Sequence, residues 1–180
     1  MTEGGPSRAN AALRPGAKLA VAVVRHDARW RAAGVTDAVL ARWARAGFAA
    51  APASPGGYEM SLLLTDDREM RALNRTWRGK DAPTNVLSFP ASDNRNEPGF
   101  LGDVALAYET ARREADATGI ALPDHAAHLV VHGVLHLLGF DHATDEEAER
   151  MEALERRALA ALGIKDPYAE SGARPAEVSP

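Results

Sequence analysis

Three histidines in one short run could hold a metal ion. His132 and His136 are four residues apart, and His142 follows six residues later, with Gly139 between them. On an α-helix, residues four apart lie on one face, so the first two imidazoles can reach one ion. If the helix continued, His142 would lie about 15 Å along its axis from His132. Gly139 can end the helix, because glycine readily adopts the left-handed conformation of helix C-termini.

Three neutral imidazoles without a fourth protein ligand form the donor set of a catalytic zinc site, in which one position stays open to water. The sequence therefore predicts one Zn²⁺ bound by His132, His136 and His142. Imidazole also suits nickel, copper or iron. The ion in cells is thus not fixed by the ligands alone.

The spacing of the histidines is that of the metzincin peptidase signature, His-Glu-x-x-His-x-x-Gly-x-x-His. In those peptidases the glutamate serves as the general base. Gly133 occupies that position here and has no side chain that could do so. The run keeps the ligand geometry and lacks the peptidase base, which favours a hydrolase of another kind.

Other titratable residues surround this run or lie upstream of it. We expect His128 to be structural or to contact one of the metal-binding histidines rather than the metal itself. A fourth histidine ligand would close the position that is open to water. Asp141 either orients an imidazole or serves only as a turn residue. Asp103 could cap or brace the site, and the sequence does not decide which. We expect His125 and His26 to be surface residues.

Composition sets few limits on function. The chain has 180 residues, a net charge of −4 and no cysteine, which excludes disulfides and thiolate metal sites. Residues 1–50 carry eight Lys or Arg against three acids, whereas residues 145–155 carry six acids against Arg150. The overall charge therefore neither supports nor excludes RNA as a partner. No apolar leader or membrane-length run is present, so we expect a cytoplasmic protein.

The hydrophobic pattern predicts the elements that must position the histidines. We expect strands over 18–24, 58–65, 84–89 and 101–108. We expect helices over 37–50, 67–73, 109–118, 123–138 and 145–162, with a polar loop over 74–83. These elements suggest one α+β domain over 17–163, with a small mixed sheet of about four strands packed against about five helices. Residues 1–16 are expected to form a flexible arm, and residues 164–180 a disordered tail.

Four runs of the sequence form a specific combination: residues 73–78 (LNRTWR), 83–90 (PTNVLSFP), 101–103 (LGD) and 132–142 (HGVLHLLGFDH). Together they resemble the bacterial YbeY endoribonucleases, which are also called ribosome maturation factors. Phe140 departs from the tyrosine often found there, which keeps the ring and loses a hydroxyl. The resemblance covers roughly residues 58–163. It implies a single α+β domain, zinc on the three histidines, and a single-strand-specific endoribonuclease that acts in 16S rRNA 3′-end maturation and ribosome quality control.

The resemblance also implies a role for Arg78, the arginine of the first run. A planar guanidinium can bind two phosphate oxygens at once. We therefore expect Arg78 and His132 to be catalytic, with Arg75 and Lys80 as weaker candidates for contacts to the RNA backbone. A zinc ion held by histidines can lower the pKa of its water to about 7 and act as a Lewis acid toward phosphate. Hydroxide formed from zinc-bound water would need no strong protein base. This agrees with a glycine, Gly133, at the position of the peptidase glutamate.

Two alternatives remain open at this point. One is a metallopeptidase or another hydrolase, against which the missing glutamate argues. The other is a ribosome assembly factor whose zinc is structural and which binds rRNA or protein, with the acidic last helix as a contact surface. The expected partners are single-stranded RNA, 16S rRNA, the small ribosomal subunit and ribosome-associated proteins, with neither a membrane nor DNA among them.

Overall fold

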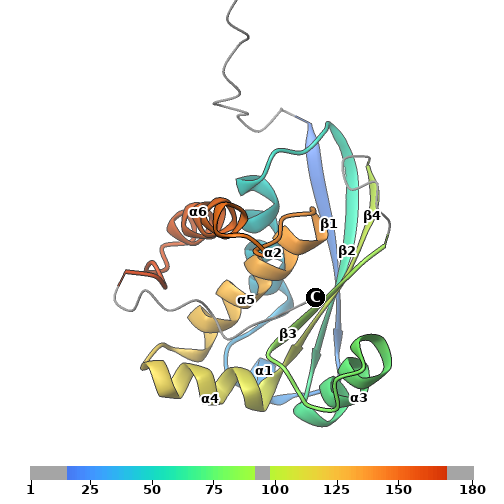
Figure 1. The fold of residues 1–180 in the computed structure, drawn as a ribbon, viewed down its shortest axis with the longest axis vertical. Coiled ribbons are helices and arrows are strands. Elements are labelled where there is room, and N and C mark those ends of the chain that lie inside the picture. Colours follow the sequence, from blue (N-terminus) through green and yellow to red (C-terminus); the bar gives the residue numbers. More distant parts are fainter. Residues whose placement is uncertain (1–15, 92–97, 170–180) are drawn as a thin grey trace, which may run out of the picture.

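The computed structural model describes residues 16–91 and 98–169. Within them the chain forms one mixed sheet of four strands in the order β1-β2-β4-β3 (Figure 1). The strands are β1 (Ala17–Arg25), β2 (Gly56–Thr65), β3 (Val86–Pro90) and β4 (Gly99–Ala107). β1, β2 and β4 run parallel, and β3 pairs antiparallel with β4. β3 is therefore an edge strand of the sheet.

Six helices accompany the sheet in the described residues. They are α1 (Arg29–Ala32), α2 (Asp37–Ala50), α3 (Asp67–Arg78), α4 (Tyr108–Thr118), α5 (Leu122–Leu137) and α6 (Asp145–Ala161). In Figure 1, α2, α5 and α6 lie on one side of the sheet and α3 lies on the other. No helix within the described ranges is both long enough and apolar enough to cross a bilayer.

The main hydrophobic core lies between the sheet and helices α2, α5 and α6. On β2, alternate residues Met60, Leu62 and Leu64 are buried in this core, as expected for a strand whose side chains point to opposite faces in turn. Leu63 packs on the other face, in a smaller cluster that includes Met70 of α3. Helix α5 is buried over most of its length, which fixes the direction in which its histidines point.

Local sequence signals account for several helix ends. Thr144 caps α6, and its side chain and that of Glu147 form a reciprocal capping box. Asp66 caps α3 by accepting a hydrogen bond from the backbone N–H of Glu69. α4 ends at Gly119, which has a positive φ of 68°.

The predicted α+β class, single domain and four-stranded sheet are confirmed, with differences in detail. The short helix α1 was not predicted. The polar loop expected over 74–83 was wrong at its start, because α3 continues to Arg78 and ends at Gly79, whose φ is 68°. The side chain of Asn74 is buried and donates a hydrogen bond to the carbonyl of Ala82. This polar residue therefore holds the turn that follows α3.

The described residues also bear on the expected ends of the chain. Residues 164–169, placed in the expected disordered tail, are described, and Tyr168 packs against His128 with ring centroids 5.7 Å apart. Residues 1–15 and 170–180, where the arm and the rest of the tail were expected, lie outside the described residues.

Candidate metal centre and its surroundings

The three predicted histidines converge on one point. Their ring nitrogens lie within 4.8 Å of one another, and Nε2 of His132 is 3.0 Å from Nε2 of His136. The ring of His142 lies 5.4 Å from that of His132 and 5.1 Å from that of His136, measured between centroids. Nitrogens bound at about 2.05 Å to a tetrahedral zinc would be about 3.3 Å apart. The donor set and its spacing therefore fit one ion.

The end of helix α5 brings His142 back to the other two histidines. The N–H of Gly139 donates to the carbonyl of His136, and the N–H of Phe140 donates to that of Leu135. Gly139 has a φ of 93°, which confirms its predicted role in the turn. Asp141 then accepts a hydrogen bond of 2.8 Å from the backbone N–H of His142. This bond is typical of a turn residue, and the Asp141 carboxylate also acts electrostatically on His136.

The histidine side chains are set in surroundings that keep them available as ligands. His132 is buried, and His136 and His142 are partly buried. Burial, followed by the neighbouring imidazoles of His132 and His142, lowers the pKa of His136 to about 3. This ring is thus neutral at physiological pH, as a metal ligand must be.

Glu155 of α6 fixes the orientation of His132. Its Oε1 lies 2.6 Å from Nδ1 of His132, and its Oε2 lies 3.1 Å from Nε2 of His128. Because a carboxylate can only accept, we assign the proton of His132 to Nδ1, which leaves the Nε2 lone pair facing the other histidines. Burial alone would raise the pKa of Glu155, but the hydrogen bonds from the two histidines outweigh it and hold that pKa below its usual range.

Tyr168 completes the contacts around Glu155. Its hydroxyl donates to Glu155 Oε2 and lies 3.3 Å from Nε2 of His128. Glu155 itself is only 1% exposed, so its charge is stabilised by three donors rather than by water. His128 contacts Glu155 and is not among the three histidines whose nitrogens converge, which agrees with the structural or supporting role that we expected for it.

Gly133 has no room for the side chain that a metzincin carries there. A Cβ atom built on it would lie 2.6 Å from Val104 Cγ1 of β4 and 3.3 Å from Ser88 Oγ of β3. Helix α5 therefore lies against the sheet at this residue, with the backbone of the helix in direct contact. A glutamate at this position would therefore require Val104 or its surroundings to shift.

Arg78 is linked to the same helix indirectly, through Ser88 of β3. Arg78 Nη2 donates to the carbonyl of Ser88 at 3.4 Å, and Ser88 Oγ donates to the carbonyl of Gly133 at 3.3 Å. Gly133 directly follows His132. Burial lowers the pKa of Arg78, but a guanidinium remains charged at neutral pH. Arg78 thus lies at the open edge of β3, two hydrogen bonds from the helix that carries the histidines.

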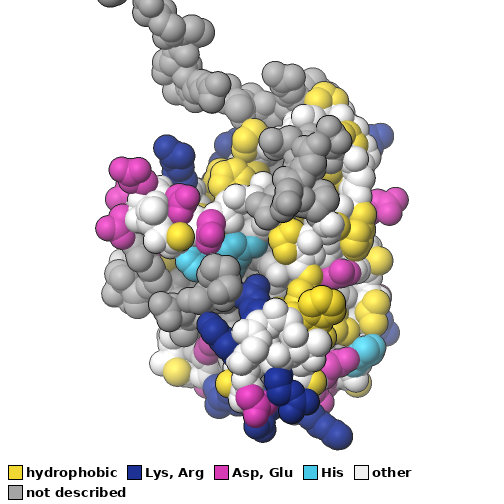
Figure 2. Space-filling view, turned by 45° about the vertical axis from the view of Figure 1, so that its right-hand side comes forward, with side chains coloured by type: hydrophobic (Ala, Val, Ile, Leu, Met, Phe, Trp, Pro, Cys, Tyr) yellow, Lys and Arg dark blue, Asp and Glu magenta, His cyan; other side chains and the backbone are white. Residues whose placement is uncertain are grey.

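The other predicted cations lie further out. Arg75 is exposed and its Nη1 lies 4.0 Å from Oδ1 of Asp81. Lys80 is also exposed. Figure 2 shows histidine side chains reaching the surface, with acidic side chains on one side and Lys or Arg side chains and a hydrophobic patch on the other.

Three residues considered from the sequence lie away from the metal centre. His26 is half exposed and pairs with Glu69, as expected of a surface residue. Asp103 accepts a hydrogen bond from Ser61 on the neighbouring strand, so it braces the sheet rather than the histidines. His125 corrects our expectation of exposure. Its side chain is 11% exposed and its Nε2 lies 2.7 Å from Glu114 Oε2, because α4 packs against α5.

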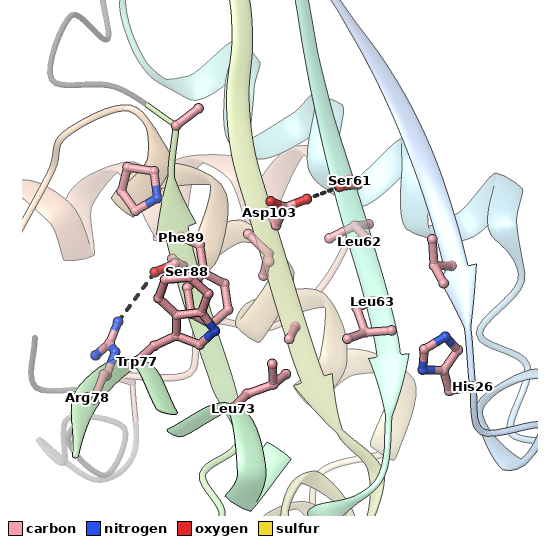
Figure 3. A pocket seen from close by; sticks show the side chains of 15 residues that line it. His26, Ser61, Leu62, Leu63, Leu73, Trp77, Arg78, Ser88, Phe89 and Asp103 are labelled. Carbon is pink, nitrogen blue, oxygen red and sulfur yellow. Dashed lines mark hydrogen bonds between the residues drawn. The ribbon is translucent and has the colours of Figure 1, made fainter. Parts of the chain in front are cut away.

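A groove lies on the α3 side of the sheet, with a volume of about 760 Å³. Its lining is largely apolar and includes Leu63, Leu73, Trp77 and Phe89. Figure 3 shows Arg78 and Trp77 on the β3 side of this groove and His26 on the β1 side. Sequence reasoning did not identify the groove, because it is formed by residues from five separate elements or their ends.

The comparison with known proteins agrees with this architecture. The sequence model of the family described as endoribonuclease YbeY matches residues 32–163. The chain is 50% identical over 150 residues to "Endoribonuclease YbeY" of Rhodopseudomonas palustris (strain HaA2), covering 78% of this chain and 77% of that relative. It is 56% identical over 149 residues to the protein of the same name in Rhodospirillum rubrum, covering 78% of this chain and 74% of the relative.

The fold is also found in a distant solved structure. The solution structure of TM1509 from Thermotoga maritima superposes with a TM-score of 0.53 at 17% identity and covers 86% of this chain and all of that one. This likeness concerns the fold alone. The family match and the extensive identity show that the chain belongs to the endoribonuclease YbeY family.

Proposed function

We propose that this protein cuts single-stranded RNA at one Zn²⁺ site held by His132, His136 and His142. As a member of the endoribonuclease YbeY family, the chain is a hydrolytic nuclease. The observation that supports the rest is the convergence of three histidine nitrogens within 4.8 Å, with Arg78 linked through Ser88 of β3 to the helix that carries two of them. A zinc ion at such a site supplies Lewis acidity toward a phosphate oxygen and makes a water molecule acidic enough to attack near neutral pH.

The protein's own residues supply orientation and charge. Glu155 holds the Nδ1 proton of His132 and so keeps Nε2 directed at the site. His136 stays neutral through burial and offers its lone pair at physiological pH. Arg78 binds the phosphate and offsets the charge that grows on its oxygens during cleavage. We therefore assign catalysis to Arg78 and His132 and metal binding to the three histidines.

The absence of a general base at Gly133 supports phosphodiester rather than peptide chemistry. A peptidase of the metzincin type needs a glutamate there, and the contact with Val104 leaves no space for one. Hydrolysis that needs no carboxylate base at this position remains compatible with the site. The metallopeptidase alternative is correspondingly disfavoured.

The biological setting is proposed on the family alone. We propose 16S rRNA as the substrate, with roles in maturing its 3′ end and in ribosome quality control in the cytoplasm. The small ribosomal subunit and its associated proteins would be the partners. The acidic first turn of α6, with Asp145, Glu146 and Glu147, offers a surface for a basic protein rather than for RNA.

The test compares RNA cleavage by the zinc-loaded wild type with that of His132→Ala and Arg78→Ala. Arg68→Ala is the matched control, since Arg68 is an exposed arginine near the other end of α3. Both site variants should lose cleavage while circular dichroism shows that they are folded, and the control should cut normally. Equal cleavage by wild type and both site variants would remove the catalytic assignment.

The assembly-factor alternative has its own discriminator. A folded His132→Ala variant that restores rRNA processing in a deletion strain would show that binding, not cleavage, is the function. The proposal predicts no rescue.

A further inference from the structure

We propose that the groove on the α3 side of the sheet binds nucleobases of the RNA strand whose phosphate Arg78 holds, with Trp77 as the stacking platform. This inference rests on the proposed function, because it names how the same substrate is held. The groove is the 760 Å³ hollow described above, which lies within the size range of small-molecule sites. It is continuous with the edge of β3, where Arg78 lies (Figure 3).

Trp77 is unusually exposed for its type. Its exposed fraction is 69%, whereas the other two tryptophans, Trp30 and Trp43, are 0% and 6% exposed. Its ring lies 6.2 Å from that of Phe89 with planes inclined at 65°, so two aromatic surfaces meet at this end of the groove. Trp77 belongs to the contiguous apolar lining of the groove, and contiguous exposed apolar patches mark binding sites. Stacking on a base would cover the indole, and it is tolerant of sequence because every base has a π-face.

The charges around the groove favour a nucleic acid strand over an apolar peptide. Arg78 directly follows Trp77, so a guanidinium and an indole stand side by side at the end of α3. Arg75 and Lys80 add two exposed cations at the same helix end. Proteins that bind single strands combine such a cationic track for the backbone with aromatic rings for the bases.

The arrangement also connects the groove to the metal centre. Ser88 lines the groove and bonds to Arg78 through its carbonyl and to Gly133 through its hydroxyl. Figure 2 shows hydrophobic, Lys or Arg, and histidine side chains neighbouring one another on this face. A strand that crosses the edge of β3 would place one phosphate at Arg78, the bases on one side in the groove, and the next backbone links toward the histidines.

Tryptophan fluorescence of the zinc-loaded protein tests this proposal. Because Trp30 and Trp43 are buried, quenching by a stacked base reports on Trp77. A ten-nucleotide single-stranded oligoadenylate should quench the emission saturably. In an anisotropy titration of the same oligonucleotide carrying a fluorescein label, Trp77→Ala should weaken binding by about 5- to 100-fold, and Trp77→Phe should retain most of the affinity. Phe100→Ala is the control, since Phe100 is 50% exposed but does not line the groove.

The outcomes separate this proposal from the proposed function. Binding of the RNA without quenching, or wild-type affinity in Trp77→Ala, overturns the groove assignment while cleavage could persist. Quenching by RNA in a protein that does not cut it supports the groove and removes the catalysis. If an apolar decapeptide quenches Trp77 and the RNA does not, the groove belongs to a protein partner and the proposal is wrong.

A second inference comes from an independent observation at the other end of the chain. We infer that Tyr168 is a positioning residue for the metal centre, acting through Glu155. Its hydroxyl donates to Glu155 Oε2, and its ring stacks edge-on against His128. Arg156 lies over the same ring, 4.9 Å from its centroid, and also pairs with Asp166 at 3.2 Å. These contacts hold the segment after α6 against the buried Glu155 carboxylate, which orients His132.

The test measures zinc affinity by competition with a chromophoric chelator. Tyr168→Phe keeps the ring contacts and removes only the donor to Glu155. We expect roughly tenfold weaker zinc binding, by analogy with other residues that orient metal ligands. The thermal midpoint of the metal-free variant is the companion measurement. A lowered midpoint with unchanged zinc affinity would show a merely structural role and overturn the inference, as would wild-type values of both.

Discussion

Replacing Gly133 with alanine should destabilise the protein, although alanine is the better helix former. The added Cβ would lie 2.6 Å from Val104 Cγ1 and 3.1 Å from Val104 Cγ2. Carbon atoms in contact prefer about 3.5–4.0 Å, so the nearer pair would overlap by roughly 1 Å. Val104 is fully buried, and its β-branched side chain has little rotamer freedom with which to escape.

Two terms decide the size of this effect. Overpacking a dense core costs about 1–3 kcal/mol, while removing glycine from a helix interior gains about 1 kcal/mol. We expect a net loss of up to about 2 kcal/mol in the free energy of unfolding, measured by urea titration of the metal-free protein. Gly133→Glu adds a carboxylate to the same contact and should cost more or prevent folding.

Val104→Ala provides the internal control for this reasoning. It removes the two methyl groups that the new Cβ would strike, at a cost of its own for the lost packing. The double variant should therefore be less destabilised than the sum of the single variants, by about 1 kcal/mol or more. The steric explanation for the missing glutamate is refuted if Gly133→Ala is more stable than wild type, or if the two changes are additive.

Three further predictions concern the metal centre. Glu155→Gln should weaken zinc binding by about 10- to 100-fold in a chelator competition. Glu149→Gln, which changes an exposed residue of the same helix, should leave zinc affinity unchanged. Equal zinc affinities of the two variants would count against the role of Glu155. Stripping zinc should lower the thermal midpoint by several degrees, since ligand at 100 times its Kd stabilises by about 2.7 kcal/mol; an identical midpoint with and without zinc would contradict binding to the folded state. The pKa of about 3 for His136 means that the folded, metal-free protein binds fewer protons than the unfolded chain between pH 3 and about 6.5, so its stability should fall on acidification through this window. This loss should shrink in His136→Ala, and an identical pH dependence in both proteins would speak against it.

The histidine run was predictable because its logic is local. Spacing of four residues places His132 and His136 on one helix face, and the turn at Gly139 returns His142 to them. Strand and helix order also followed from alternation and capping signals such as Thr144. These features depend on residues within one or two turns of each other, where sequence patterns are informative.

The supports of the site were missed because they come from distant parts of the chain. Glu155 reaches His132 across 23 residues, and Ser88 reaches Gly133 across 45. One signal for Glu155 was present, since it lies on the buried stripe of α6 with Met151 and Leu159. An acid on an apolar helix face needs a buried partner. No comparable signal marked Ser88, whose role depends on how closely α5 approaches the sheet.

The end of α3 was mispredicted for a related reason. The polar residues from Asn74 onward suggested a loop, but Asn74 is buried by its bond to Ala82 and the helix stops only at Gly79. This extra turn is what places Trp77 and Arg78 together at the edge of β3. Composition correctly indicated that residues 74–83 are polar. It could not show which of their side chains are buried against the rest of the protein.

Zinc-edge X-ray absorption on the zinc-loaded protein tests the central claim most directly. We expect one zinc per chain with four ligands, of which three are imidazole nitrogens at about 2.0 Å and one is an exchangeable oxygen. His142→Ala should reduce the imidazole count by one. A fourth protein ligand in the wild type, or an unchanged imidazole count in His142→Ala, would contradict an open metal centre built on these three histidines.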